Sequence, residues 1–180
     1  EQALSDPHEL TEEQSKVLDI LTNSGKREFY LKGVTGSGKT EVYLHLARQI
    51  IDSGKSVILL VPEISLTPQL MRHFNERFGN IVAMLHSNQT VKEKEISYNR
   101  LLQGDAKIAI GPRSAVFAPV QNLGLIIIDE EHDPSYNQDS HPRYDARTVA
   151  RERCNHNQAT LLFGSATPSL DTYSRFLDSK

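Results

Sequence analysis

The amino-acid sequence predicts an α/β fold, with a mostly parallel sheet and helices on both of its faces. Apolar, β-branched runs of strand length alternate along the chain with segments that have the apolar spacing of helices. A glycine-rich loop joins the first strand to a helix, and a later apolar run at 125–128 ends in three acidic residues. Strands that alternate with helices pair in parallel through right-handed crossovers, which place helices on both faces of one sheet.

The individual elements follow from apolar period and from glycine and proline punctuation. The first helix begins at a capping box, in which Thr11 is followed three positions later by Gln14. Gly54 and Gly79 stop the second and third helices. The predicted elements, in order, are a helix at 10–21, a strand at 29–31, a helix at 41–51, a strand at 56–61, a helix at 67–78, a strand at 81–85, a helix at 91–102, strands at 107–110 and 125–128, a helix at 146–154 and a strand at 160–163.

Composition and charge are those of an ordinary globular domain and exclude several kinds of protein. Of the 180 residues, 38% are hydrophobic and 24% charged, and no apolar run is long enough to cross a bilayer. The formal net charge of -3 provides no overall basic field, so any contact with DNA must be local. Cys154 is the only cysteine, which excludes internal disulfides and a thiolate zinc cluster built from this chain alone.

The first residues predict a linker at 1–9, followed by one domain at 10–180. The segment EQALSDPHEL has neither the basic patch nor the apolar core of a secretory signal. Pro7 and the mixed charges around it are typical of a connection within a longer polypeptide. We therefore expect a fragment of a larger cytoplasmic protein that has no association with a membrane.

The segment GVTGSGKT fits the phosphate-loop pattern G-x-x-x-x-G-K-[ST], and it stands between a strand and a helix as that motif requires. Its glycines let backbone N–H groups close round a polyphosphate at the positive end of the helix. Lys39 is expected to reach the terminal phosphates, and the Thr40 hydroxyl to bind magnesium. The nucleotide-binding residues expected in this loop are Gly33, Thr35, Gly36, Ser37, Gly38, Lys39 and Thr40.

The acidic stretch after the run at 125–128 is placed where the carboxyl end of a buried strand faces a ligand crevice. Adjacent carboxylates repel one another unless a cation lies among them, although a solvated acidic turn would look the same by itself. Beside a phosphate loop, the stretch predicts a magnesium–nucleotide site in which Asp129 helps Thr40 to hold Mg²⁺ and Glu130 orients or deprotonates the attacking water. The expected catalytic residues are thus Glu130, Lys39 and Asp129, with their charge conflict relieved only when the metal is bound.

Two further motifs give the chain a resemblance to the superfamily 2 helicases. His132 completes the pattern Asp-Glu-x-His, and Ser165, Ala166 and Thr167 end the last predicted strand within GSATPS. The resemblance implies a RecA-like phosphate-loop NTPase domain in which Gln14 reads the adenine. It also implies that His132 and the Ser-Ala-Thr segment couple the state of the nucleotide to the grip on DNA. For Gln14 a second role stays open, because the same side chain fits the capping box with Thr11.

Within that superfamily, nearly the whole chain resembles the bacterial helicases that restart replication. The segments that carry the resemblance are GVTGSGKTEVYL, LVPEISLTPQ, LHS, GPRSAVFAP, IIIDEEHDPSYNQD, PRY and GSATPSL. They imply the ATP-binding lobe of a 3′ to 5′ DNA helicase that acts in replication restart and primosome assembly at stalled forks. The implied cofactors are ATP and Mg²⁺, with no zinc in this chain because the family's zinc site lies outside it. The implied partners of the full-length protein are single-stranded and forked DNA, primosome proteins and single-strand-binding proteins.

The resemblance also implies a face that binds single-stranded DNA, formed by the segments at 62–69 and 111–119. The hydroxyls of Ser65 and Thr67 can take phosphates without reading bases, and Arg113 with Ser114 offers a second phosphate contact. Thr67 is equally suited to cap the helix that begins at Pro68, and an exposed arginine can instead form a surface ion pair.

The loop at 133–144 resembles the aromatic-rich loop that links DNA contact to hydrolysis in these helicases. Tyr136 and Tyr144 are expected to stack on bases, which requires no particular base sequence. Arg143 and Arg147 are expected to assist. The same residue types also suit an ordinary loop.

We expect the chain to be one of the two lobes of a helicase. Helicases of this kind close two lobes over the nucleotide, and an arginine from the second accelerates phosphoryl transfer on the order of a thousandfold or more. The chain alone is therefore expected to bind Mg-nucleotide weakly, to bind DNA poorly and not to unwind it. Two alternatives stay open: another superfamily 2 duplex DNA translocase, and a nucleotide-dependent switch that binds a partner without hydrolysis.

Overall fold

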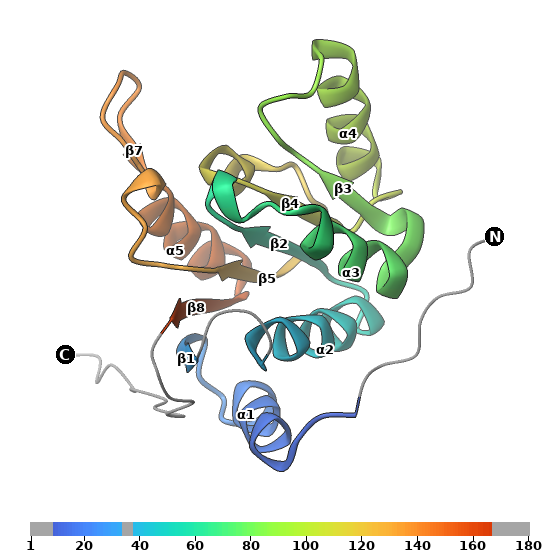
Figure 1. Ribbon diagram of the computed structural model, residues 1–180, viewed down its shortest axis with the longest axis vertical. Coiled ribbons are helices and arrows are strands. Elements are labelled where there is room, and N and C mark those ends of the chain that lie inside the picture. The colour runs from blue at the N-terminus through green and yellow to red at the C-terminus, as the bar shows by residue number, and fades with distance from the viewer. Residues whose placement is uncertain (1–8, 34–37, 167–180) are drawn as a thin grey trace.

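A six-stranded, fully parallel sheet forms the centre of the computed structural model, which describes residues 9–33 and 38–166 (Figure 1). Its strands are β1 Glu28–Gly33, β2 Ser56–Leu60, β3 Val82–Met84, β4 Ile108–Gly111, β5 Leu123–Ile128 and β8 Thr160–Ala166. They lie in the order β1-β8-β5-β2-β4-β3, and each neighbouring pair is parallel. The predicted α/β class is confirmed.

Helices cover both faces of this sheet. They are α1 Glu12–Asn23, α2 Gly38–Asp52, α3 Pro68–Phe78, α4 Val91–Gln103 and α5 Ala146–Asn157. The side chains of β2 alternate between the faces, so that Leu59 packs in a core with residues of the first three helices, and Ile58 in a core with Leu101 of α4 and Ala150 of α5. Within the two described ranges, no helix combines the length and the apolar character needed to span a membrane.

Every regular helix and main-sheet strand predicted from the apolar period is present, with ends displaced by a few residues at most. The capping box of Thr11 and Gln14 at the start of α1 is also confirmed. The short elements were not predicted, because they are too short for a helical period and most of them contain no apolar run. These are the 3-10 helices η1 Glu63–Ser65, η2 Gly79–Ile81, η3 Arg113–Phe117 and η4 Pro134–Tyr136, and the hairpin of β6 Asn137–Gln138 and β7 Tyr144–Asp145.

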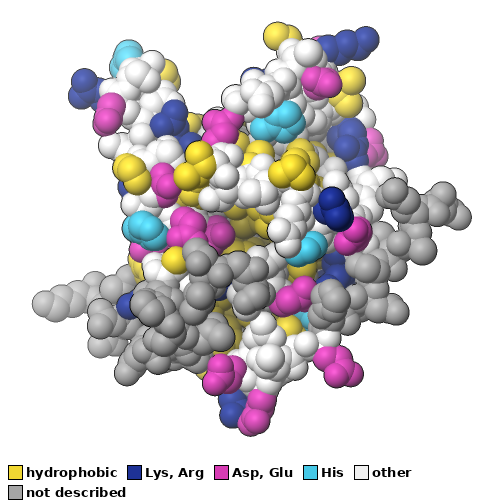
Figure 2. All heavy atoms as spheres, in the orientation of Figure 1, with side chains coloured by type: hydrophobic (Ala, Val, Ile, Leu, Met, Phe, Trp, Pro, Cys, Tyr) yellow, Lys and Arg dark blue, Asp and Glu magenta, His cyan; other side chains and the backbone are white. Residues whose placement is uncertain are grey.

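Two projections stand out from the body of the molecule: α4, and the hairpin of β6 and β7 (Figure 1). The space-filling view in Figure 2 shows a hollow between them. Residues that follow the carboxyl ends of β2, β3 and β4 line this hollow, among them Glu63, Leu85 and Pro112. The hollow thus lies at the edge of the sheet where α/β proteins usually bind ligands.

Candidate nucleotide and nucleic-acid site

Lys39 connects the helix of the phosphate loop to the acidic stretch that follows β5. Because β8 alone separates β1 from β5, the segments that leave these two strands meet at one edge of the sheet. The Lys39 ammonium nitrogen lies 3.3 Å from Asp129 Oδ1 and 3.1 Å from Glu130 Oε1. Lys39 is only 4% exposed. The structure therefore brings together the three residues that the sequence singles out for catalysis.

This arrangement corrects the expectation that only a bound metal relieves the repulsion between the acidic side chains. The ammonium group of Lys39 lies between Asp129 and Glu130 and supplies the missing positive charge. Because Lys39 is almost completely buried, little water screens its attraction to either carboxylate. The acidic edge is thus already organised by a residue of the phosphate-loop motif.

Tyr43, one turn beyond Lys39 on α2, also holds Asp129. Its hydroxyl donates a hydrogen bond of 2.8 Å to Asp129 Oδ1, and burial followed by the charge of Asp129 raises its pKa well above the ordinary value. Gly164 of β8 leaves room for this contact. A Cβ atom there would collide with the Tyr43 hydroxyl and lie 2.8 Å from Asp129 Oδ1. Sequence reasoning missed both residues, although the spacing from Lys39 to Tyr43 is that of one helix face.

Glu130 has a backbone conformation that is unfavourable for a residue with a side chain. Its φ angle is 47°, in the left-handed region, which costs about 1–2 kcal/mol for most residues. The turn is held by two hydrogen bonds, from Asp133 N to Glu130 O at 2.8 Å and from Glu131 N to Gly164 O at 2.9 Å. His132 lies beside it, with Nε2 3.8 Å from Glu130 Oε2 and a side chain that is 60% exposed.

The prediction that Tyr136 stacks on DNA bases is wrong. Tyr136 is completely buried in the core beneath α5 and belongs to η4. Its hydroxyl proton is shared between the carbonyl oxygens of Asp129, at 2.5 Å, and Leu60, at 3.1 Å. An aromatic ring with a polar tip suits such a buried place when its hydroxyl finds partners. Tyr136 therefore fixes the ends of β2 and β5 to each other and presents no surface to a ligand.

Arg147 is committed to interactions within the protein. Its guanidinium group donates to both carboxylate oxygens of Asp145 and to the carbonyl oxygen of Glu131, the last at 2.9 Å. The hydrogen bonds from Arg147 lower the pKa of Asp145, and the same bonds raise the pKa of Arg147. Asp145 also caps α5, because its Oδ1 accepts from Arg147 N at 2.8 Å. The acidic stretch is thus tied to the start of α5, which the sequence motifs do not reveal.

Gln14 forms the predicted capping box and also reaches the start of α2. Its Oε1 accepts from Thr11 N at 2.8 Å, which completes the capping box, while its Nε2 donates to Gly38 O at 3.2 Å. The cap therefore leaves the side chain beside the phosphate loop. An apolar pocket formed in part by Val17, Leu31 and Val42 adjoins it. The contact with adenine stays a prediction.

The remaining nucleotide and coupling residues lie along the edge between the phosphate loop and β8. Gly33 ends β1 and pairs with Ala166, while Ser165 pairs with the residue before Gly33. Gly38 and Thr40 begin α2 beside Lys39. The predicted residues Thr35, Gly36, Ser37 and Thr167 lie outside the described part of the chain.

The expected DNA-binding residues other than the tyrosines differ in how far solvent reaches them. Thr67 caps α3, since its Oγ1 accepts from Leu70 N at 3.2 Å, but it is still exposed. Ser65 is half-buried in η1. Ser114 in η3 and Arg143 in the hairpin are exposed. The hydroxyls of Thr67 and Ser114 and the guanidinium of Arg143 can thus be reached from solvent, whereas their contact with DNA stays a prediction.

Arg113 forms a bridge from η3 to the aromatic loop. Its Nη1 donates to the carbonyl oxygens of Ser135 and Asn137, both at 3.0 Å, and its guanidinium carbon lies 5.7 Å from the ring centroid of Tyr144. Tyr144 in turn packs edge-on against Phe117, with ring centroids 5.0 Å apart. No ion pair to Arg113 is present among the described residues. Arg113 and Tyr144 therefore hold the loop in place as well as bordering the hollow.

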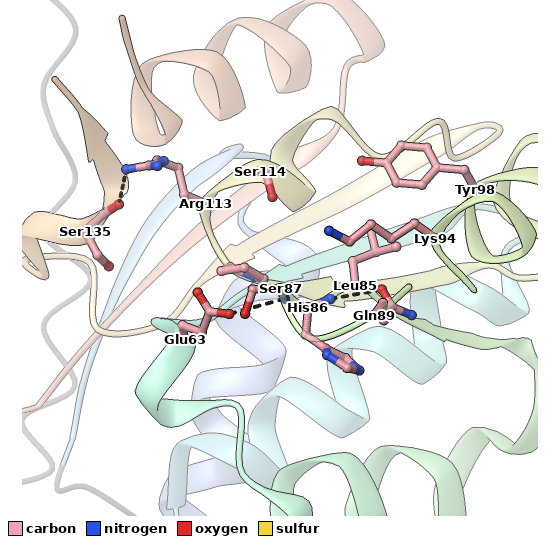
Figure 3. Close-up of a pocket in the computed structure, with 11 residues that line it drawn as sticks. Glu63, Leu85, His86, Ser87, Gln89, Lys94, Tyr98, Arg113, Ser114 and Ser135 are labelled. Carbon is pink, nitrogen blue, oxygen red and sulfur yellow. Dashed lines mark hydrogen bonds between the residues drawn. The ribbon is translucent and has the colours of Figure 1, made fainter. Parts of the chain in front are cut away.

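A pocket of about 400 Å³ occupies the hollow (Figure 3). Arg113, Ser114 and Ser135 form one side of it, and Lys94 and Tyr98 of α4 form the opposite side. Glu63 and Ser87 lie along another side and are joined by a hydrogen bond of 3.2 Å from Ser87 N to Glu63 Oε1. Sequence reasoning had not assigned any residue of α4 to a site.

The donor set suits a magnesium ion that is held jointly with phosphates. Among the described residues, no group of three or more His, Cys, Asp and Glu side chains could hold a metal ion. Asp129 is half-buried and near the start of α2, where the Thr40 hydroxyl lies. Magnesium is commonly bound by only one or two protein oxygens, with waters and substrate phosphates completing the octahedron. The residues present therefore fit magnesium as part of a nucleotide complex.

Comparison with known proteins identifies the class to which this fold and site belong. The profile of the family described as DEAD/DEAH box helicase matches residues 11–176. The chain belongs to the DEAD/DEAH box helicase family, and this membership implies a nucleotide-binding site.

Two similar proteins from different bacteria share the name Replication restart protein PriA. The Replication restart protein PriA of Bacillus subtilis (strain 168) is 45% identical over 175 residues, which are 95% of this chain and 22% of that protein. The Replication restart protein PriA of Synechocystis sp. is 50% identical over 167 residues, which are 92% of this chain and 20% of that protein. The chain thus spans about a fifth of the length of these relatives.

Solved structures agree with the fold. The structure of RecG bound to a three-way DNA junction superposes with a TM-score of 0.67 at 28% sequence identity, covering 91% of this chain and 22% of that one. The Pyrococcus furiosus Hef helicase domain superposes with a TM-score of 0.62 at 20% identity, covering 89% of this chain and 33% of that one. The RecA-like α/β architecture predicted from the sequence is therefore confirmed.

Proposed function

We propose that this chain is the ATP-binding lobe of a 3′ to 5′ DNA helicase that restarts replication at stalled forks in the bacterial cytoplasm. The observation that carries the proposal is the position of Lys39, whose ammonium group contacts Asp129 and Glu130 at the edge where a phosphate-loop motif opens α2. The name shared by the relatives, Replication restart protein PriA, supports the restart role.

Lys39 has a specific part in nucleotide binding. In the structure its positive charge is shared between Asp129 and Glu130. The terminal phosphates of ATP compete for the same ammonium group, because they carry more negative charge than either carboxylate. Binding therefore draws Lys39 toward the phosphates and leaves the two carboxylates free for the metal and the attacking water.

Asp129 and Glu130 then have separate tasks. Magnesium, when bound with the nucleotide, neutralises charge that develops on the phosphates during transfer. Asp129, oriented by Tyr43, and the Thr40 hydroxyl would hold that ion. Glu130 has a left-handed backbone conformation, with φ at 47°. We propose that its carboxylate accepts a hydrogen bond from the attacking water. His132, 3.8 Å from Glu130, lies where it can pass changes at the nucleotide to the DNA-binding face.

We expect efficient ATP hydrolysis and DNA unwinding only in the longer protein. We propose that a second lobe supplies the arginine that stabilises the transferring phosphoryl group, as in other two-lobed engines. Single-stranded and forked DNA are the proposed substrates, and primosome and single-strand-binding proteins the proposed partners. Ser65, Thr67, Ser114 and Arg143 are proposed to contact the DNA strand, with Tyr144 at its border.

Nucleotide binding by the chain alone tests the proposal. A fluorescent ATP analogue is titrated with Mg²⁺ into the chain and into Lys39→Ala, and ATP turnover is followed with and without forked DNA. We expect weak binding that requires Lys39 and negligible turnover. Binding that survives Lys39→Ala would show that the site is not the one proposed.

Two further measurements separate the alternatives. If Glu130→Gln in the full-length protein leaves ATP turnover unchanged, the chain is a nucleotide-dependent switch and not part of a hydrolytic engine. If the full-length protein unwinds or remodels duplex DNA with no preference for forks, it is a different superfamily 2 translocase. Strong DNA-stimulated turnover by the chain alone would contradict the need for a second lobe.

A further inference from the structure

We infer that the face of α4 formed by Lys94 and Tyr98 is a subsite for one nucleotide of single-stranded nucleic acid. Neither the sequence motifs nor the family membership assigns a role to this helix. The inference rests on the proposed function, because it adds a wall to the DNA-binding face proposed there.

The first observation is the direction of the two side chains. Lys94 and Tyr98 are four positions apart, so they lie one above the other on the same face of α4. Both line the pocket of about 400 Å³, and Figure 3 shows them pointing into it from the side opposite Arg113 and Ser114. The pocket has the size of those that take small ligands, and it opens into the hollow between α4 and the hairpin.

The second observation is that both groups are available to a ligand. Among the described residues, no ion pair engages the Lys94 ammonium. Tyr98 is 36% exposed and is not among the ring pairs of the described core. An unpaired cation one helical turn from an exposed aromatic ring provides what a single nucleotide needs, a partner for its phosphate and a surface for its base.

The third observation is how the other charges of the pocket restrict the ligand. Glu63 lines the pocket on another side, where its carboxylate accepts a hydrogen bond from Ser87 N. Its negative charge keeps a phosphate away from that side and leaves the side of Lys94. Arg113 is held by the carbonyl oxygens of Ser135 and Asn137 and by the Tyr144 ring. Lys94 is therefore the freer of the two cations that line the pocket.

The other polar side chains of the pocket discriminate poorly between bases. The Gln89 side chain is occupied locally, since its Oε1 accepts from His86 N at 3.1 Å and its Nε2 donates to Met84 O at 2.9 Å. Ser87 and Ser114 offer hydroxyls, which either donate or accept. Stacking on Tyr98 with a phosphate at Lys94 thus binds any base, which suits a protein that moves along single strands.

The test is a titration of the chain with a single-stranded oligothymidylate of about eight nucleotides, followed by ¹H–¹⁵N correlation spectra so that weak binding is measured and located. We expect shift changes at the start of α4 and in the residues round the pocket. Tyr98→Ala should weaken binding by roughly 5- to 100-fold, and Tyr98→Phe, which keeps the ring, should change it little.

Lys94→Ala is compared with Lys92→Ala, which removes the same charge from the same helix. Lys92 is exposed and lies about 200° round the helix from Lys94. We expect Lys94→Ala to reduce the slope of log affinity against log salt by about 0.7, the value for one phosphate of a single strand, and Lys92→Ala to leave the slope nearly unchanged.

The outcomes separate this inference from the proposed function. The subsite is refuted if the oligonucleotide binds without changing the chemical shifts of α4. It is also refuted if Lys94→Ala and Tyr98→Ala change the affinity and its salt dependence no more than Lys92→Ala does. In both cases the DNA-binding role stands. If no binding is detected even at millimolar oligonucleotide, the DNA-binding face proposed for this lobe is refuted together with the subsite. Nucleotide binding that depends on Lys39 would be untouched by either result.

Discussion

At the scale of single residues, the nucleotide edge depends on side chains outside the recognised motifs. Tyr43 orients Asp129 through a hydrogen bond of 2.8 Å from a fully buried hydroxyl. Lys39 contacts the same carboxylate at 3.3 Å. Two side chains of α2 therefore hold the same oxygen of Asp129, Oδ1.

Tyr43→Phe should weaken Mg²⁺-dependent nucleotide binding by roughly tenfold, because a hydrogen bond to a charged group contributes about 1.5–3 kcal/mol. Binding measured with a chelator in place of Mg²⁺ should be nearly unchanged, since the contact acts on the metal ligand. A fluorescent nucleotide titration at several magnesium concentrations measures both. Tyr30→Phe, which removes a hydroxyl that bonds Arg151 and not Asp129, is the control, and equal losses in the two variants would contradict the positioning role.

The left-handed backbone of Glu130 gives a second prediction. Glu130→Ala and Glu130→Gly remove the same carboxylate, so their difference reports the backbone alone. Because Gly adopts a φ of 47° without strain, Glu130→Gly should be more stable than Glu130→Ala by about 1 kcal/mol, although Gly is normally the less favourable residue. Urea unfolding of both variants measures this, and an alanine variant as stable as the glycine variant would show that the turn is unstrained.

At the scale of elements, the link between the acidic stretch and α5 depends on the ionised Asp145. Asp145 caps α5 and binds the Arg147 guanidinium, and these bonds lower its pKa below the ordinary value. A lowered pKa in the folded state stabilises the fold above the unfolded pKa of about 3.9, and this stabilisation is lost as the pH falls through the folded value.

Asp145→Asn should therefore destabilise the chain by about 1 kcal/mol at pH 7, a modest amount because both partners are partly exposed. The gap between wild type and variant should close as the pH is lowered below about 4. Unfolding by urea across this pH range measures it. Asp139→Asn, which alters an exposed residue of the neighbouring hairpin, is the matched control, and a gap that persists undiminished at low pH would contradict the role of the charge.

The elements that could be predicted differ from those that were missed in whether their sequence shows a regular apolar pattern. Helices were predicted because their apolar spacing extends over two turns or more, as in α2, and strands of the sheet because they are unbroken apolar runs, as in β5. The hairpin of β6 and β7 and the 3-10 helices were missed because they are too short for a helical period and, apart from η3, contain no apolar run. Tyr136 was misassigned for a related reason: its partners, the carbonyl oxygens of Leu60 and Asp129, come from two separate strands, and a loop sequence carries no sign of them.

At the scale of the whole molecule, the core shared by α4 and α5 on one face of the sheet buries the only cysteine. Cys154 is 3% exposed in the core beneath α5, and burial raises its pKa to about 12. Both effects suppress reaction with thiol reagents, because the thiolate is the reactive form.

Alkylation of Cys154 should therefore proceed only through unfolding, at a rate many orders of magnitude below that of free glutathione at the same pH. The rate should rise with added urea in parallel with the unfolded fraction measured by circular dichroism. Mass spectrometry of quenched samples measures the labelled fraction. Labelling of the native chain at a rate near that of glutathione would show that α5 opens locally.

The parts of the site that belong to known motifs could be predicted from the sequence. The contacts that depend on the order of strands in the sheet could not. Lys39 and Asp129 could be joined from the sequence because the phosphate loop implies an acidic partner at the end of another strand. Nothing in the sequence places β8 between β1 and β5, so the fit of Gly164 against Tyr43 and Asp129 could not be foreseen. The position of Lys94 and Tyr98 at the pocket could not be predicted for the same reason. The pairing of β3 with β4 brings α4, which follows β3, to the pocket.

The position of β8 between β1 and β5 also affects the order in which the sheet can assemble. β1 is synthesised before the other strands of this sheet, yet among the described strands its hydrogen-bonded neighbour is β8, with Glu28 paired to Leu161 and Gly33 to Ala166. The strands β2 to β5 can assemble early, whereas β1, with the phosphate loop that follows it, must wait for the last strand to be synthesised. Such distant pairing slows folding. A nascent chain interrupted before β8 would therefore have a partial sheet but no nucleotide site.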